Sequence, residues 1–554
     1  MSDQKGKGLF MNYDATHYYL YDEMTALLNF WASEYPDVLT VSSIGRSYQG
    51  REIPLVTLTL GRGKKPAVLI DGNIHSAEVI SSCAVLYTID KLLAQYRAGD
   101  SEILQILRDK ILYLIPRINV DAVDVNLTTD EFCRGSLLPF HEAEDGVRRC
   151  DVDGDGVVHQ MRRKNPEGSW YASKLDDMVM FRIWPGMPVP EDAVRYDFIC
   201  EGLYQGDGEP EFREARSPYD IDPNRSFPFE WKRDAIGVTL RNAAGDYPLQ
   251  DCETRALANF IQSHPEIMLN VNTHSNMGTY ITPMDFTQHI ERTEPILADE
   301  AVFDAIGEDG VKISGYKAKN VFPKEAVCPA PGSYTTWLYY MLGIPAWCAE
   351  IGPLKLLYTN KEEADTMYFM DELSTEEMVV EHRRRLVEWD RTKNGGAWYM
   401  PWHEFEHPQF GTIEIGGWAN TNDTNCIWNL PGEYLARDCE DAYRFYLLNI
   451  RAAAQLKLLA FTAEDGHAAA TIANIGRFPS TKTWLAHEKG FCSPGMVQIE
   501  GLHAGKATVL IREQLPVLAG GEAKALTWTL PEGGYENYRI TIEGECAGEQ
   551  ILEA

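Results

Sequence analysis

The stretch from Ala67 to Glu78 reads AVLIDGNIHSAE, and it predicts how the rest of the chain is organised. Its first four residues are apolar and predict a buried strand, which the turn-forming DGN triplet ends. A helical pattern of apolar residues begins at the end of the stretch. His75 and Glu78 therefore lie where a strand passes into a helix. Ligands of open α/β sheets bind at this edge, outside the carboxyl ends of the strands.

Two further apolar runs have the same form, one carrying His274 at its end and the other ending in Glu350. Three strands would thus deliver these side chains, together with the first pair, to one edge of a sheet. Two histidines and one glutamate, with a fourth position left to water, form a known catalytic zinc ligand set. We therefore expect His75, Glu78 and His274 to bind one zinc ion. Glu350 then remains as the general base.

Strands alternate with helices around these stretches. Residues 54–60 and 111–115 have the pattern of strands, and residues 16–35 and 248–260 have the pattern of helices. Such alternation indicates an α/β fold with a mostly parallel or mixed sheet flanked by helices. Because 554 residues exceed what one hydrophobic core usually supports, we expect at least two domains. The first is a catalytic domain with insertions over residues 1–460.

The pattern changes after a long amphipathic helix that we expect over residues 433–459. From about residue 461 the chain shows short alternating runs separated by Gly and Pro turns. This pattern is typical of a small β-sandwich, and we expect one over residues 461–554. The segment contains no cluster of titratable residues, so its role could be stabilising, oligomeric or substrate-presenting.

The chain is strongly acidic, with a formal net charge of −31. Such a field repels phosphate backbones, so we expect no nucleic-acid partner. No stretch is apolar and long enough to span a membrane, and the polar N-terminal residues show no signal-peptide pattern. The eleven cysteines lack C-x-x-C pairs and favour reduced thiols over a disulfide framework. We expect a cytoplasmic protein that does not bind membranes.

Several motifs follow one another in a fixed order along the chain. They are residues 44–53, His75 with Glu78, residues 116–121, Arg163-Lys164, Asn224-Arg225, His274-Ser275, Gly332-Ser333 with Trp337, and Glu350. This order resembles that of the zinc metallocarboxypeptidases, the family of carboxypeptidases A, B and T. The first motif is similar to the family's Gly-x-Ser-x-x-Gly-Arg strand entry, and the third resembles its Pro-x-x-Asn-Pro-Asp turn. Each motif alone is weak, but their shared order points to this family.

The resemblance implies further site residues. In the family, an arginine just before a lysine helps to polarise the scissile carbonyl. Arg163 is the residue that matches, and it would meet the charge that develops on the carbonyl oxygen. The pair Asn224 and Arg225 matches the residues that hold the C-terminal carboxylate, which a guanidinium can bind with two parallel hydrogen bonds. Tyr334 falls near the position that helps to set side-chain specificity.

The sequence departs from the family pattern at three places. Better-known members carry a substrate-capping tyrosine shortly before the Gly-Ser pair, where this chain has Val327. Ala77 replaces the arginine that is common between the first histidine and its glutamate, which suggests different contacts to the upstream part of a peptide. Residues 166–222 contain a polar, proline-rich insertion that is much shorter in compact members. It could narrow access to the site or lie on the surface.

Two further motifs could bind metal ions. Asp151, Asp153 and Asp155 occupy the first, third and fifth places of a calcium-type loop with glycine at the sixth. The bidentate glutamate is missing at the twelfth place, so a structural calcium ion competes with a plain Asp-Gly turn. Residues 403–407 read HEFEH and satisfy the zincin pattern, but prolines bracket them too closely for a stable helix. We expect that they are not the catalytic zinc site.

The motifs together predict a zinc-dependent carboxypeptidase that removes the last residue of a peptide with a free C-terminus. Three alternatives stay open. A hydrolase of the same family could cut a cell-wall peptide, such as a γ-glutamyl-diaminopimelate bond. A catalytically silent relative could bind C-terminal tails, although the intact Glu350 and Arg163 argue against it. A zincin endopeptidase would use His403 and His407. The favoured C-terminal residue and the oligomeric state do not follow from any motif.

Overall fold

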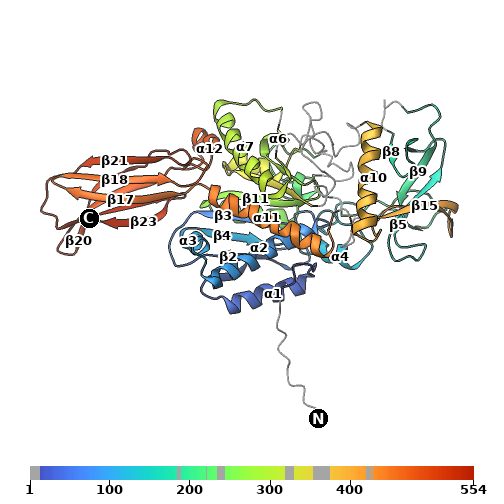
Figure 1. Ribbon diagram of the computed structural model, residues 1–554, viewed down its shortest axis with the longest axis horizontal. Coiled ribbons are helices and arrows are strands. Elements are labelled where there is room, and N and C mark those ends of the chain that lie inside the picture. Colours follow the sequence, from blue (N-terminus) through green and yellow to red (C-terminus); the bar gives the residue numbers. More distant parts are fainter. Residues whose placement is uncertain are drawn as a thin grey trace, which may run out of the picture.

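The structure is a computed structural model that describes residues 13–183, 189–219, 221–233, 244–287, 289–318, 330–352, 375–419, 426 and 428–554. Figure 1 shows an elongated molecule in three parts. A central α/β body lies between a C-terminal pair of β-sheets at one end and a second group of strands at the other. None of the helices in these residues is long and apolar enough to cross a membrane.

The central sheet has eight strands in the order β1-β2-β4-β3-β11-β14-β12-β13. These are β1 (Leu39–Arg46), β2 (Glu52–Leu58), β3 (Ala67–Gly72), β4 (Ile111–Ile115), β11 (Ile267–Ser275), β12 (Thr279–Ile281), β13 (Lys317–Ala318) and β14 (Ala346–Ile351). The neighbours β4, β3, β11 and β14 are parallel, whereas the pairs β1/β2, β2/β4 and β12/β14 are antiparallel. The expected mixed sheet flanked by helices is confirmed.

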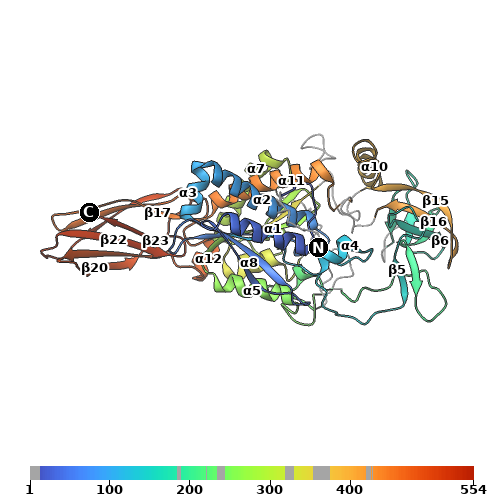
Figure 2. The same cartoon turned by 90° about the horizontal axis from the view of Figure 1, so that it is seen from below.

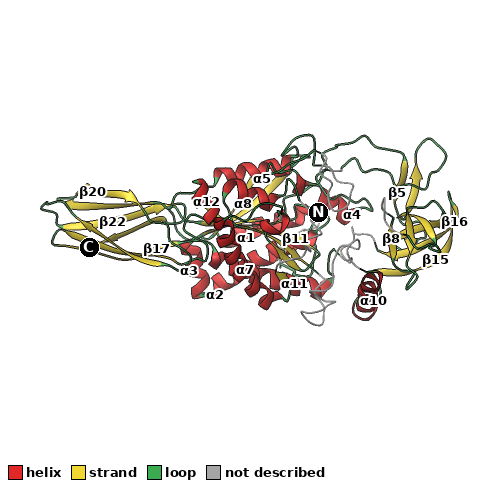
Figure 3. Ribbon diagram, turned by 90° about the horizontal axis from the view of Figure 1, so that it is seen from above, coloured by secondary structure: helices red, strands yellow, loops and turns green. Residues whose placement is uncertain are grey.

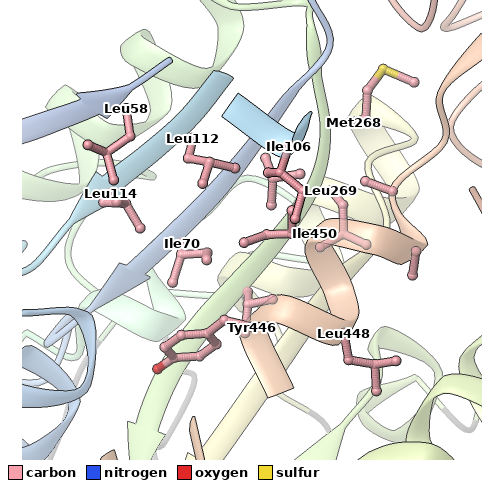
Figure 4. Packing of buried hydrophobic residues seen from close by; sticks show 14 of the residues in the cluster. Leu58, Ile70, Ile106, Leu112, Leu114, Met268, Leu269, Tyr446, Leu448 and Ile450 are labelled. Carbon is pink, nitrogen blue, oxygen red and sulfur yellow. The ribbon is translucent and has the colours of Figure 1, made fainter. Parts of the chain in front are cut away.

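Strand β3 is buried along its whole length because helices cover both faces of the sheet. Val68 and Ile70 point into a core shared with α1 (Tyr21–Glu34), α2 (Val79–Ala98), α7 (Glu294–Ser314) and α11 (Gly432–Ala452). Ala67 and Leu69 point into a second core, shared with α5 (Cys252–Ser263) and α8 (Tyr334–Leu342). Figure 4 shows the first core, with Ile70 beside Tyr446 of α11. This burial on both faces explains the unbroken apolar run of the sequence.

The remaining helices of the body are short. They are α3 (Ser101–Asp109), α4 (Ala122–Thr128), α6 (Pro283–Phe286) and the 3₁₀ turn η1 (Pro223–Arg225). Figure 3 shows α3 toward the C-terminal sheets and α4 toward the second group of strands. Helix α10 (Glu376–Lys393) stands beside the second group of strands (Figure 2).

That second group is a six-stranded antiparallel sheet in the order β15-β16-β6-β9-β7-β8. Its strands are β6 (Gln160–Lys164), β7 (Trp170–Ala172), β8 (Met180–Arg182), β9 (Arg195–Cys200), β15 (Tyr399–His407) and β16 (Gly411–Trp418), and the pair β5 (Gly146–Arg149) and β10 (Gly202–Gln205) accompanies it. Strands β7, β8 and β9 of the insertion expected over residues 166–222 join this sheet through β6, with which β9 pairs. On its other side β6 pairs with a distant part of the chain, because Glu414 of β16 lies opposite Arg162 of β6. We call these strands the inserted sheet.

The C-terminal part contains two sheets, β17-β18-β21 and β20-β19-β22-β23. The strands are β17 (Leu456–Glu464), β18 (His467–Asn474), β19 (Met496–His503), β20 (Lys506–Gln514), β21 (Ala523–Thr529), β22 (Asn537–Gly544) and β23 (Gly548–Glu553), with α12 (Trp484–Lys489) after β18. Ile472, Val497 and Ile540 from both sheets share one core, as in a sandwich. The helix expected over residues 433–459 is shorter than predicted, because α11 ends at Ala452 and β17 begins at Leu456.

Candidate metal centre and active site

The three predicted metal ligands meet at the carboxyl edge of the central sheet. His75 and Glu78 lie between β3 and α2, and His274 lies near the end of β11. Their donor atoms all lie within 4.8 Å of one another, and all three side chains are buried. Nδ1 of His75 is 2.8 Å from one carboxylate oxygen of Glu78, and Nδ1 of His274 is 3.0 Å from the other. The structure thus brings the predicted set together.

The loop after β3 is held in shape by Asn73. Its φ angle of 61° is left-handed, a region that asparagine enters more readily than most residues. Its side-chain amide donates to the backbone carbonyls of His75 and Glu78, at 2.7 and 3.2 Å. Because Gly72 of β3 is paired with Thr273 of β11, this loop emerges beside His274.

The outer ring nitrogens of the two histidines both face hydrogen-bond acceptors. Nε2 of His75 donates to Asp222 at 2.9 Å, and Nε2 of His274 donates to the amide oxygen of Asn272. Such partners fix the tautomer of a metal-binding histidine, so that Nδ1 keeps its lone pair. The two Nδ1 atoms face each other at 3.1 Å. Tetrahedral zinc requires a separation of about 3.3 Å between two nitrogen ligands, so the donor set fits one zinc ion.

Glu350 lies on β14 directly opposite His274 of β11. Its Oε2 atom is buried and has no hydrogen-bond partner among the described residues, whereas the thiol of Cys348 approaches Oε1 at 3.8 Å. Burial raises the pKa of Glu350. A carboxylate with a raised pKa and a free oxygen beside the metal ligands suits a general base.

An arginine that the sequence did not single out completes this arrangement. The guanidinium of Arg134 lies 3.4 Å from Glu78 and 3.3 Å from Asp222, and its side chain is 13% exposed. Burial would raise the pKa of Asp222, but the charges of Arg134 and His75 hold it well below the usual range. The backbone carbonyl of Arg134 also accepts a hydrogen bond from Ser76. Arg134 is therefore fixed at the metal centre from two sides.

Arg163, expected to stabilise the oxyanion, lies elsewhere. It belongs to β6 of the inserted sheet, and Figure 2 shows this strand at the far end of the molecule from the C-terminal sheets. Its guanidinium pairs with Asp197 at 2.9 Å and stacks over Phe212. The structure contradicts its expected place in the site, because an antiparallel β-strand holds the Arg-Lys pair away from the metal ligands.

The predicted carboxylate-binding pair lies next to the metal ligands. Asn224 and Arg225 form η1, and the amide nitrogen of Asn224 is 3.5 Å from the ring of His274. Nη1 of Arg225 donates to the carbonyl of Asn224 at 2.8 Å, while its Nε is buried and has no partner within the described residues. Gly332 has a φ of +72° and packs so closely that a Cβ atom there would collide with the Arg225 carbonyl. A buried guanidinium with an unused N–H fits an anionic ligand.

Tyr334 is not placed to contact a substrate side chain. Its side chain is completely buried, and its hydroxyl donates to Asp71 at 3.1 Å. Its ring packs against Phe227 and Trp337. Its backbone N–H donates to the side-chain oxygen of Asn224 at 2.8 Å. The specificity role expected for its side chain is wrong, because the ring belongs to the core beneath the site. Val327 lies outside the described residues.

The other two motifs lie in or beside the inserted sheet. Residues 403–407 are in strand β15, not a helix, and the His407 ring bonds the Gly202 carbonyl. Histidines four residues apart on a strand are separated by about 13 Å, so the zincin alternative is wrong. Carboxylate oxygens of Asp151, Asp153 and Asp155 lie within 4.8 Å of one another, but the carboxylates also accept hydrogen bonds from backbone N–H groups of their own loop. Calcium binding there stays a prediction.

Comparison with known proteins agrees with this geometry. The sequence pattern of the family described as "Zinc carboxypeptidase" matches residues 24–372. The chain therefore belongs to the zinc carboxypeptidase family. It is 35% identical to "Carboxypeptidase B" of Astacus astacus over 121 residues, which are 22% of this chain and 39% of that protein. It is 23% identical to "Zinc carboxypeptidase A 1" of Anopheles gambiae over 348 residues, 61% of this chain and 60% of that protein.

Among solved structures, the chain is similar to the carboxypeptidase A from Helicoverpa armigera, with a TM-score of 0.40 and 17% identity, over 67% of this chain and 73% of that one. The regions that match the Astacus astacus and Anopheles gambiae proteins span less than two thirds of the length of each of those proteins. The family match ends before α10, β15 and β16, and it does not include the C-terminal sheets.

Proposed function

We propose that this protein is a zinc-dependent carboxypeptidase that hydrolyses the C-terminal peptide bond of peptides. The observation that carries the proposal is the meeting of three groups at one sheet edge. These are a buried zinc-ligand set, the carboxylate of Glu350 with a free oxygen, and the buried guanidinium of Arg225. A general hydrolase needs the first two, and recognition of a free C-terminus requires the third.

The residues divide the chemistry between them. His75, Glu78 and His274 would hold the zinc ion, which would supply Lewis acidity toward the scissile carbonyl and the attacking water. The carboxylate of Glu350 removes a proton from that water and later gives it to the leaving amine. The carboxyl group of Glu350 thus transfers one proton from the attacking water to the nitrogen of the leaving amine.

Arg134 takes the role that the family resemblance had given to Arg163. Its guanidinium lies beside the metal ligand Glu78 and beside Asp222, the partner of His75, so it can meet negative charge as it develops on the carbonyl oxygen. Asn224 and Arg225 hold the carboxylate of the substrate and so place the last peptide bond against Glu350. The substrate is a peptide with a free C-terminus.

The test is mass spectrometry of a mixed peptide set after incubation with zinc-loaded protein. Each peptide is supplied as the free acid and as the C-terminal amide, with a chelated sample as control. We expect loss of single residues from the free acids only, abolished by the chelator and by Glu350→Gln. Cleavage of the amides at the same rate would contradict the proposal.

Absence of cleavage of every linear peptide would also contradict it, and γ-glutamyl-diaminopimelate peptides would then be tested. A binding-only role is distinguished in the same samples. Retained affinity for the free acids without turnover in the zinc-loaded protein would favour a tail-binding protein over an enzyme.

A further inference from the structure

A buried carboxylate beneath the site connects its two halves. Asp71, at the end of β3, is completely buried, as are its three partners. One oxygen accepts a hydrogen bond from the amide of Asn272 at 2.5 Å. The other accepts from the amide of Asn270 at 2.6 Å and from the hydroxyl of Tyr334 at 3.1 Å. The donors come from β11, which carries His274, and from α8, whose first residue bonds Asn224.

The first connection runs to a metal ligand. Ionised Asp71 is acceptor-only, so the side chain of Asn272 must turn its NH₂ group toward it. The amide oxygen of Asn272 then faces Nε2 of His274. An oxygen at that position requires the proton on Nε2, which leaves the lone pair on Nδ1 at the metal position. Asp71 thereby determines the tautomer of His274 through one intervening amide.

The second connection runs to the carboxylate-binding pair. The hydroxyl of Tyr334 is held by Asp71, and its backbone N–H donates to the side-chain oxygen of Asn224 at 2.8 Å. Because that oxygen is occupied, the NH₂ group of Asn224 is directed toward the site, 3.5 Å from His274. Asp71 thus also fixes the first residue of α8 and, through it, the orientation of Asn224 beside Arg225.

The two metal-binding histidines differ in this respect. Nε2 of His75 bonds a carboxylate directly, at Asp222, whereas Nε2 of His274 bonds the amide oxygen of Asn272, whose NH₂ group donates to the carboxylate of Asp71. Burial raises the pKa of Asp71 to about 6, although its three hydrogen bonds act to lower it, so the group is ionised at neutral pH. An ionised carboxylate only accepts hydrogen bonds, so both asparagine amides must turn their NH₂ groups toward it. A neutral carboxyl group both donates and accepts, and it would not fix this orientation.

We propose that Asp71 is a positioning residue that jointly sets His274 for zinc and Asn224 for the substrate carboxylate. The inference rests on the proposed function for the second role, while the first concerns zinc binding alone. Removing an outer hydrogen-bond partner of a metal ligand typically weakens metal binding by about 10–100-fold. We expect this loss in Asp71→Asn and in Asn272→Leu.

The zinc test compares dissociation constants from competition with a coloured chelator, on protein shown to be folded by its thermal midpoint. Asn270→Ala is the matched control, because it removes a hydrogen bond to the same carboxylate but lies on neither connection. It should lose stability and keep wild-type zinc affinity. Wild-type zinc affinity in folded Asp71→Asn would overturn the proposal, and so would equal losses of affinity in Asp71→Asn and Asn270→Ala.

The carboxylate test uses zinc-loaded protein carrying Glu350→Gln, so that peptides bind without turnover. Calorimetry measures the affinity for one peptide as the free acid and as the amide. Adding Tyr334→Phe should reduce the preference for the free acid and leave zinc affinity unchanged, whereas Asp71→Asn should reduce both. An unchanged preference in Tyr334→Phe would overturn the second connection.

The two single-route variants keep the proposal testable if Asp71→Asn does not fold. Asn272→Leu reports only on zinc, and Tyr334→Phe reports only on the free-acid preference; wild-type values in both would overturn it. Failure of the proposed function looks different. In that case the protein would bind zinc but neither cut nor prefer free acids, and the zinc affinities would still decide whether Asp71 controls His274.

Discussion

The edge of the central sheet and the inserted sheet carry the same kinds of residues with opposite consequences. At the edge, His75, Glu78 and His274 end parallel strands and converge in a buried site. In the inserted sheet, His403 and Arg163 lie along antiparallel strands, with side chains 45% and 41% exposed. The carboxyl ends of neighbouring parallel strands lie at one edge of the sheet, so residues that follow them come close together. Residues within one strand are instead spaced along its length. A metal-binding or catalytic sequence motif therefore predicts a site only when the secondary-structure element that carries it brings its residues together.

The largest expected difference concerns zinc. His75→Ala removes one of three ligands at the sheet edge and should abolish stoichiometric zinc binding and all activity. His403→Ala in the inserted sheet should keep one zinc ion per chain and full activity. Atomic absorption of dialysed protein, with peptide turnover on the same samples, measures both. Loss of zinc in His403→Ala would reverse the assignment of the two regions.

The general base gives the next largest difference. Glu350→Gln keeps the shape and the zinc but cannot accept a proton, so turnover should fall by about 10²–10⁴-fold. Glu404 occupies the corresponding place in the HEFEH motif but is exposed on β15, and Glu404→Gln should leave turnover unchanged. Steady-state rates on one free-acid peptide compare the two. Near-normal turnover in Glu350→Gln would exclude it as the base.

The two arginines are expected to differ somewhat less. Arg134→Ala removes a donor aimed at the developing oxyanion and should lower kcat by about 10²–10³-fold. Arg163→Ala breaks only an ion pair with Asp197 in the inserted sheet and should leave kcat at the wild-type value. Thermal midpoints of both variants show whether each is folded. A wild-type kcat in Arg134→Ala would exclude Arg134 from the oxyanion, and a loss in Arg163→Ala as large as that in Arg134→Ala would contradict the placement of Arg163 outside the site.

The sequence predicted the parts of the fold that follow from local pattern. The strand at 111–115 was predicted with the observed bounds, and the zinc ligands follow from apolar runs that end in polar residues. Arg134 has no such signal, since it is a single arginine in a loop. Arg134 reaches the metal centre because a distant segment, residues 221–222, packs against it. A Cβ atom at the neighbouring Gly135 would collide with the Ile221 carbonyl, and Asp222 pairs with Arg134. In the sequence alone, the Arg-Lys pair at Arg163 therefore matches the family motif better than Arg134 does.

The inserted sheet could not be predicted for a related reason. Its strands β6 and β16 pair across more than two hundred residues of sequence, as Arg162 and Glu414 show. Period-two patterns identify strands but not their partners. Likewise, the Gly332-Ser333 motif before Tyr334 is visible in the sequence, but the burial of the Tyr334 ring depends on packing against Phe227, more than a hundred residues earlier.

The smallest expected difference is in the pH dependence of stability. Burial raises the pKa of Glu201, between β9 and β10 of the inserted sheet, to about 7, although backbone N–H groups donate to it. Between about pH 4.5 and 7 the folded chain holds a proton there that the unfolded chain has released. The contribution of Glu201 to the free energy of unfolding therefore falls as the pH rises through this range. Asp222 at the metal centre has a lowered pKa, so its contribution is present at neutral pH and is lost only in acid.

Glu201→Gln stays neutral at every pH and should remove this decline, which amounts to about 1–3 kcal/mol between pH 5 and 7. Denaturant unfolding of the wild type and the variant at pH 5, 6 and 7 measures it. Glu404→Gln, an exposed glutamate of the same sheet, is the control and should keep the wild-type slope. An unchanged slope in Glu201→Gln would show that Glu201 is ionised throughout this range. Glu201 in the inserted sheet and Asp222 at the metal centre would then both be ionised between pH 5 and 7. The contrast in pH dependence between the two regions would disappear.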